Sequence, residues 1–300
     1  MTVDLKNRMR RKARRIVPNC REVAISHNRK STPVVMPELN DTSRVEWTEV
    51  KPEGHSKAKP HFLGHAALRI PDTSTPRYKL SWPLKYGYFN EEDYESKDAI
   101  VRDVSLILED AIENQLGITR KRDRAQYGCV YIIPDLYERT YVASILDLLL
   151  RELGFGRVCF IQESMAGSFG AGYATCVIVD VGAQKTSICC VDEGMCVESS
   201  RISLRYGGFD VTETFMKMML TDSFPYSDIN LNRRYDFLLA DELKQKFCTL
   251  SVLDFAPQQC EFFLRVAGED TRQYYFRAYD EVILAPMVRA SSIIDSNLVI

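Results

Sequence analysis

A short run of residues near the middle of the chain has the types and spacing of a phosphate-binding hairpin. Residues 176–180 read Cys-Val-Ile-Val-Asp, an apolar strand that ends in a carboxylate, and Val181-Gly182 lead into a returning strand at Thr186. Glycine at such a turn lets backbone N–H groups approach phosphate oxygens, and a carboxylate at the strand end holds Mg²⁺, usually through water. A hairpin without any ligand has the same pattern, so this segment alone leaves both interpretations open.

The elements around the hairpin alternate between helical and strand periodicity. Apolar residues at helical spacing predict helices over 96–116, 139–153, 164–172, 210–220 and 234–250. Short apolar or alternating runs predict strands over 129–133, 158–161, 176–180, 186–191, 195–203, 260–266 and 274–279, the last two as a hairpin. The β-α-β-α order implies a partly parallel sheet with helices on its faces.

Composition is that of a globular protein in a reducing compartment. The 300 residues suffice for two compact domains, with 45% hydrophobic and 27% charged residues. No apolar run approaches the length of a membrane span. Several of the nine cysteines lie inside apolar strand-like runs, which favours buried free thiols in the cytosol or nucleus over disulfides.

The first sixty residues differ from the rest, with weak periodicity that predicts a loosely structured region. The start is basic and lacks the apolar stretch of a secretory signal, and the absence of serine fits poorly with a mitochondrial presequence. The cluster is suited to DNA phosphate contacts or nuclear localisation, although an exposed helix face explains it equally well. Its members are Arg8, Arg10, Arg11, Lys12, Arg14 and Arg15. The spacing of His55, His61 and His65 argues against a metal site.

Further motifs carry a family resemblance. They are the segments 82–87 (Trp-Pro-Leu-Lys-Tyr-Gly), 131–135 (Tyr-Ile-Ile-Pro-Asp), 160–163 (Phe-Ile-Gln-Glu), 207–210 (Gly-Gly-Phe-Asp) and 244–248 (Lys-Gln-Lys-Phe-Cys). In order and spacing, from about Phe62 to Met287, these resemble the actin superfamily. They are more similar still to the nuclear actin-related proteins that serve the INO-type chromatin remodeller.

The resemblance implies an actin-like (ribonuclease H-like) α/β fold with mixed sheets flanked by helices. It implies a basic N-terminal region over 1–60, a partial first lobe over 61–172 and a partial second lobe over 173–300. Actin's first phosphate loop and its second adenosine motif have no counterpart here, so we expect a fold incomplete at both ends. Nucleotide binding by this chain alone is therefore in doubt.

The resemblance also implies a site for ATP with Mg²⁺, in which Asp180 holds the metal through water. The implied contact residues are Gln162, Asp180, Val181, Gly182, Ala183, Gln184, Lys185, Thr186, Gly207, Gly208 and Lys244. The pattern is broken at four positions. Ala183 stands where actin has its second carboxylate, Gln184 where it has a second glycine, and Ser187 where it has the histidine that polarises water. Gln245 replaces an acid beside Lys244, and the helix's two lysines also fit a solvated face.

Without the second carboxylate and the histidine, hydrolysis should be very slow or absent. The sequence thus favours a non-catalytic nuclear subunit of a chromatin-remodelling complex, with roles in transcription regulation, DNA repair and recombination. The implied partners are actin, another nuclear actin-related protein, a helix of the remodeller's motor subunit, histones or nucleosomes, and DNA, with no membrane. A weak ATP-binding protein or ATPase is the alternative, and a filament-forming protein is a weaker one.

Overall fold

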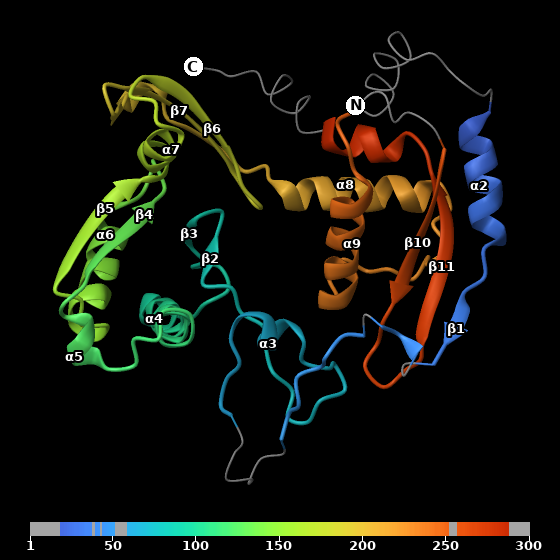
Figure 1. The fold of residues 1–300 in the computed structure, drawn as a ribbon, viewed down its shortest axis with the longest axis horizontal. Coiled ribbons are helices and arrows are strands. Elements are labelled where there is room, and N and C mark those ends of the chain that lie inside the picture. Colours follow the sequence, from blue (N-terminus) through green and yellow to red (C-terminus); the bar gives the residue numbers. More distant parts are fainter. Residues whose placement is uncertain (1–18, 38–39, 43, 52–58, 252–256, 288–300) are drawn as a thin grey trace. The chain divides into compact units, whose positions relative to one another are not determined.

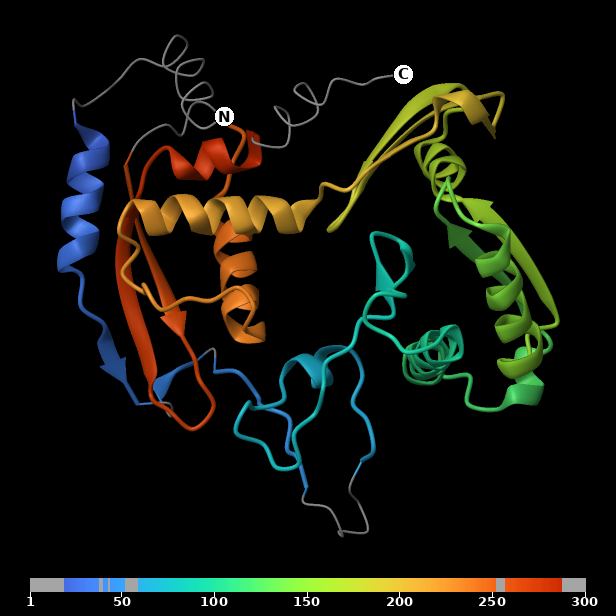
Figure 2. The same cartoon turned by 180° about the vertical axis from the view of Figure 1, so that it is seen from behind.

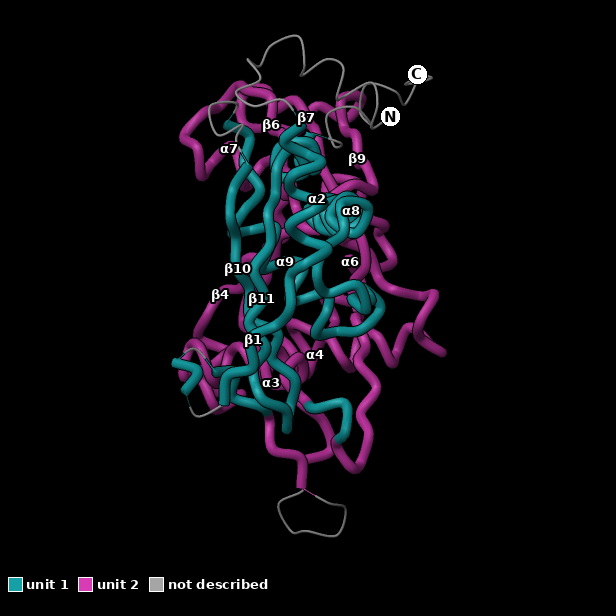
Figure 3. The backbone as a smooth tube through the Cα atoms, turned by 90° about the vertical axis from the view of Figure 1, so that its right-hand side faces the viewer, with its two compact units in different colours: residues 1–47, 71–73, 208–300 teal, residues 48–70, 74–207 magenta. Residues whose placement is uncertain are grey.

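The computed structural model describes residues 19–37, 40–42, 44–51, 59–251 and 257–287. The chain divides into two compact units, coloured separately in Figure 3. Unit 1 comprises residues 1–47, 71–73 and 208–300, and unit 2 comprises residues 48–70 and 74–207. These boundaries differ from the lobe boundaries at 60 and 172 that the resemblance implied, because the contacts change at the junction after Gly207. The basic cluster proposed for DNA lies outside the described residues.

Unit 1 is built on a three-stranded antiparallel sheet. Strand β11 (Thr271–Ala278) lies between β1 (Val34–Met36) and β10 (Gln258–Leu264). Helices α8 (Gly208–Thr221) and α9 (Arg234–Phe247) pack against each other, and residues 281–287 are also helical. The predicted helices over 210–220 and 234–250 and the predicted hairpin are therefore present. The fully buried side chains at the centre of this unit include Phe215, Met216, Leu243, Phe276 and Ile283.

The predicted loose structure of the first sixty residues is wrong for part of that region. Helix α2 (Cys20–Lys30) runs along β11 in both views of the fold (Figures 1 and 2). Asn28, 1% exposed, donates from Nδ2 to the carbonyl oxygens of Asp222 (3.2 Å) and Arg277 (3.0 Å), and accepts from Arg277 N–H (2.7 Å). These contacts span about two hundred residues of chain, so a local periodicity analysis does not detect what orders the helix.

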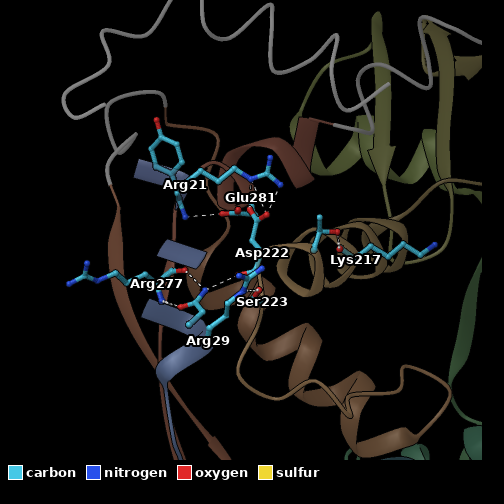
Figure 4. A network of polar contacts seen from close by, with 10 residues as sticks. Arg21, Arg29, Lys217, Asp222, Ser223, Arg277 and Glu281 are labelled. Atoms are coloured by element: carbon cyan, nitrogen blue, oxygen red, sulfur yellow. Dashed lines mark hydrogen bonds and ion pairs between the residues drawn. The ribbon is translucent and has the colours of Figure 1, made fainter. Parts of the chain in front are cut away.

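Three acidic side chains of unit 1 converge beside α2. Oxygens of Asp222, Asp280 and Glu281 lie within 4.8 Å of one another. Arg21 neutralises part of this charge, donating from Nε to Asp222 Oδ1 at 2.9 Å (Figure 4). Burial, the hydrogen bond with Asp222 and the charge of Asp280 together raise the pKa of Glu281 to about 8. Glu281 is thus held protonated near neutral pH.

Unit 2 contains a parallel pair of strands covered by helices. Strands β4 (Gly128–Ile133) and β5 (Arg157–Gln162) pair in parallel, joined by α6 (Arg139–Asp147) and the π-helical turn η2 (Leu148–Glu152). Helix α4 (Lys97–Asn114) begins where Ser96 Oγ accepts from Ala99 N–H, and α5 (Lys121–Arg124) follows it. The buried core holds Ile100, Ile145, Leu148, Leu149 and Leu153.

A second, antiparallel sheet of unit 2 carries the hairpin. Strand β7 (Thr186–Asp192) pairs with β6 (Cys176–Val181), β8 (Met195–Cys196) and β9 (Ile202–Leu204), and helix α7 (Glu163–Ala171) packs on β6 and β7. The remaining elements are α3 (Gly64–Leu68), β2 (Leu84–Lys85), β3 (Tyr88–Phe89) and the 3-10 turn η3 (Glu198–Ser200).

The strand predicted over 195–203 is wrong, because η3 divides it into β8 and β9. Ser200 Oγ accepts from Cys190 N–H (2.9 Å) and donates to Val197 O (2.8 Å), so a side chain takes the place of a ladder bond there. Within the described residues, no helix has both the length and the apolar character needed to cross a bilayer.

We predict that Glu281→Gln flattens the pH dependence of stability. A pKa raised in the folded state contributes stability that is fully present below the unfolded value of 4.5 and is lost as pH rises through about 8. Over that window wild type should lose up to about 1.4 kcal/mol per pH unit for one proton. Urea unfolding from pH 5 to 9 measures this, with the exposed Glu269→Gln as control. Parallel pH profiles for wild type and Glu281→Gln would contradict it.

Candidate nucleotide-phosphate site

The turn between β6 and β7 is closed by its own backbone. The register pairs Asp180 with Ser187 and Val181 with Thr186, and Gly182 N–H donates to Lys185 O at 2.9 Å. Ala183 and Gln184 are left at the tip. Asp180 stands exposed at the end of β6 and forms no ion pair with any residue that the structure describes. Such a carboxylate at a strand end is free to coordinate a hydrated cation.

Gln162 is the last residue of β5 and directly precedes Glu163, the first residue of α7. Its Nε2 donates to Asp135 O at 3.4 Å, across the parallel pairing of β5 with β4. The buried Asp135 carboxylate accepts from Ser164 N–H (3.2 Å) and from Ser164 Oγ (2.5 Å), which fixes the start of α7. The sequence pattern predicted no role for Asp135; the available signal was its position just after a predicted strand and directly after Pro134.

Glu163, the first residue of α7, organises the interior of the hairpin. Its Oε1 and Oε2 accept from Lys185 Nζ at 2.6 and 2.8 Å, and its Oε1 also accepts from Ser187 Oγ at 2.6 Å. Lys185 Nζ lies 3.1 Å from Ser187 Oγ. The sequence pattern did not predict Glu163 as a site residue, because only the folded register brings Lys185 and Ser187 to the helix. We call Glu163, Lys185 and Ser187 the hairpin cluster.

Two neighbouring loops press against the tip of the turn. A Cβ on Gly207 would lie 2.1 Å from Ala183 O, so only glycine allows this approach. Tyr86 N–H, in the turn between β2 and β3, donates to Gln184 Oε1 at 2.8 Å. Thr186 Oγ1 donates to Tyr206 O at 2.8 Å. The structure therefore brings Tyr86, Tyr206 and Gly207 against the turn within unit 2. Gln162 directly precedes Glu163, which contacts the same turn through Lys185.

The two remaining implied contact residues belong to unit 1. Gly208 opens α8, and its carbonyl accepts from Lys244 Nζ at 3.2 Å. Lys244 also forms an ion pair with Asp241, which accepts from Gln245 Nε2 at 2.6 Å. Burial acts to raise the pKa of Asp241, but Lys244 and the other donors outweigh it and leave that pKa below its usual value. Lys244 is thus partly buried and paired rather than part of a solvated face.

Comparison with known proteins identifies the family and the fold of this chain. The family model described as Actin matches residues 94–250, which contain the hairpin, Gln162 and Lys244. The chain belongs to the actin family. Its fold is actin-like: the solved structure "Human actin-related protein Arp8 in its ATP-bound state" superimposes with a TM-score of 0.85 at 30% identity. That match covers 96% of this chain and 56% of the human one.

Two relatives of this actin-family chain have related names. "Probable actin-related protein 8" of Schizosaccharomyces pombe is 39% identical over 284 residues, which is 95% of this chain and 42% of that protein. "Actin-like protein ARP8" of Saccharomyces cerevisiae is 35% identical over 290 residues, 96% of this chain and 32% of that protein. The chain thus spans less than half the length of these relatives.

We predict that Gly207→Ala disturbs the hairpin tip. The new Cβ would overlap the Ala183–Gln184 peptide, a backbone group that cannot swing aside, so we expect a loss of about 1–3 kcal/mol in the free energy of unfolding. Gly170→Ala in α7, where a Cβ meets nothing within 4 Å, is the matched control and should be neutral or stabilising by up to about 1 kcal/mol. Equal denaturation midpoints for the two variants would show that the close approach carries no strain.

Proposed function

We propose that this chain acts as a non-catalytic, actin-related subunit of a nuclear ATP-dependent chromatin-remodelling complex. In that role, bound nucleotide serves as part of the structure and not as a substrate. The observation that carries this proposal is the chemistry around Ser187. Its side chain is 3% exposed and its hydroxyl is donated to Glu163, so the position of actin's histidine offers neither an imidazole nor an accessible group.

The second carboxylate of actin, which would also orient metal or water, is replaced by Ala183. Ala183 has no oxygen with which to orient a hydrated metal or a water molecule. Gln162 remains and is hydrogen-bonded to Asp135, so one water-positioning amide is retained without a general base beside it. The carboxylate that contacts Ser187 is Glu163, and it is already bonded to Lys185 and Ser187. These features support binding without turnover.

The residues fit a magnesium nucleotide in part. Asp180 is exposed and unpaired among the described residues, and would hold Mg²⁺ through water, where the metal would screen phosphate charge. The Ala183–Gln184 peptide lies at the tip, packed closely by Gly207. The family resemblance assigns Lys244 and Gly208, which belong to unit 1, to the adenosine side. The ATP-bound state named for the human neighbour supports this assignment.

The partners follow from the relatives' family rather than from any surface. We propose actin, a second nuclear actin-related protein, a helix of the motor subunit, histones or nucleosomes, and DNA, with a nuclear location and roles in transcription regulation, DNA repair and recombination. Actin-fold proteins keep the fold while their chemistry varies, so the retained core and altered hairpin suit a recognition module. The basic residues Arg8–Arg15 are proposed as the DNA contact.

A slow actin-type ATPase is the second candidate, and it has one specific observation in its favour. Asp180 and Gln162 both stand where turnover would need them, at the ends of β6 and β5. The two functions therefore differ only in whether bound ATP is cleaved at a measurable rate.

Calorimetric titration with Mg²⁺–ATP, together with phosphate release on the same samples, distinguishes them. We expect either no binding or binding without turnover, and Asp180→Ala should weaken any binding by at least about tenfold, because it removes the metal-side carboxylate. Asp192→Ala, at the far end of β7, is the control. Turnover that disappears in Asp180→Ala would overturn the non-catalytic proposal and establish the ATPase.

A further inference from the structure

Lys185 supplies a cation inside the hairpin from the protein itself. Its Nζ lies 2.6 and 2.8 Å from the two carboxylate oxygens of Glu163 and 3.1 Å from Ser187 Oγ. All three donor positions of the ammonium group are thereby used. Lys185 and Glu163 side chains are 14% and 15% exposed, so water screens their attraction only weakly.

The lysine stem is enclosed as well as its charged end. A Cβ on Gly87, whose φ is +83°, would lie 3.0 Å from Lys185 Cε and 3.3 Å from Pro134 Cγ. The side chain therefore passes between the turn after β2 and the segment after β4 before it reaches α7. Its own carbonyl accepts the Gly182 N–H that closes the hairpin turn. One residue thus connects four segments of unit 2.

The charges around this point explain why a cation is needed there. Asp135 N–H donates to Glu163 Oε1 at 3.4 Å, so these two acidic residues are joined by a hydrogen bond. Asp180 is cross-strand partner to Ser187, which contacts Glu163 directly. Carboxylates gathered in this way repel one another unless a cation lies among them. Among the described residues, Lys185 is the cation that forms an ion pair with Glu163.

We propose that Lys185 is a positioning residue that fastens the phosphate hairpin to helix α7, so that the hairpin holds one conformation with or without nucleotide. The ammonium group is committed to Glu163 and Ser187, so it is not a phosphate contact. The inference rests on the proposed function, since a hairpin set by an internal ion pair suits a subunit that keeps one shape rather than cycling with ATP.

Hydrogen exchange of the full chain, with and without saturating Mg²⁺–ATP, tests this. In wild type, amides 182–187 should change by less than about twofold on adding nucleotide. In Lys185→Met without nucleotide they should exchange at least about tenfold faster, and Lys185→Arg should restore protection to within about threefold. Lys217→Met, which removes an exposed ion pair with Glu213, is the control and should leave these amides unchanged.

One further variant and one further readout separate fastening from an orphaned charge and from a general loss of folding. Glu163→Gln with Lys185→Met removes both charges, and the hairpin should remain loose; restored protection would overturn the proposal, because the single variant would then report only an unpaired carboxylate. Equal acceleration of the β4 and β5 amides would overturn a local role. A wild-type hairpin that slows about tenfold or more with Mg²⁺–ATP would overturn it too. The nucleotide-free comparison stands even if calorimetry detects turnover, so the two proposals fail separately.

Discussion

The short turn that joins β6 to β7 is the constraint on which the site depends. Its closing bond from Gly182 N–H to Lys185 O fixes the antiparallel register, and that register alone decides which side chains face α7. A slip of β7 by one residue would turn Ser187 and Lys185 to the opposite face of the sheet, away from Glu163. The ion pair between Lys185 and Glu163 is therefore a consequence of this turn.

Removing the ion pair between Lys185 and Glu163 from water has a desolvation cost. Two charges removed from water are stabilising only where their geometry is good and their remaining hydrogen-bonding positions are filled. Here Glu163 accepts from two side chains and one backbone N–H, and Lys185 reaches three acceptor atoms. A comparable solution recurs in unit 1, where Arg21 balances the acids around Asp222, although there the surplus charge is removed by a proton on Glu281.

Much of the fold could be predicted from the sequence because its periodicity is local. Helix α4 begins at its Ser96 cap, and β4 and β5 follow their apolar runs closely. What escaped prediction depends on distant contacts: α2 is ordered by Asn28 reaching Asp222 and Arg277, and β8 is separated from β9 by a serine hydroxyl. For the site, the types and spacing of the residues in the sequence were enough to locate the hairpin. The role of Glu163 becomes apparent only with the register of β6 and β7.

The substitutions in the hairpin are coherent when they are taken together. Ser187, which stands where actin has a histidine, is buried, and its hydroxyl is satisfied by hydrogen bonds with Glu163 and Lys185. Gln184 makes a side-chain bond to the Tyr86 backbone that a glycine at that position does not offer. At Ser187 an element of water activation is exchanged for an internal hydrogen bond, Gln184 adds a second such bond, and Ala183 removes a carboxylate without adding one. A hairpin held by such internal bonds depends less on a ligand for its conformation. This is consistent with an actin-family chain in which bound nucleotide has a structural role.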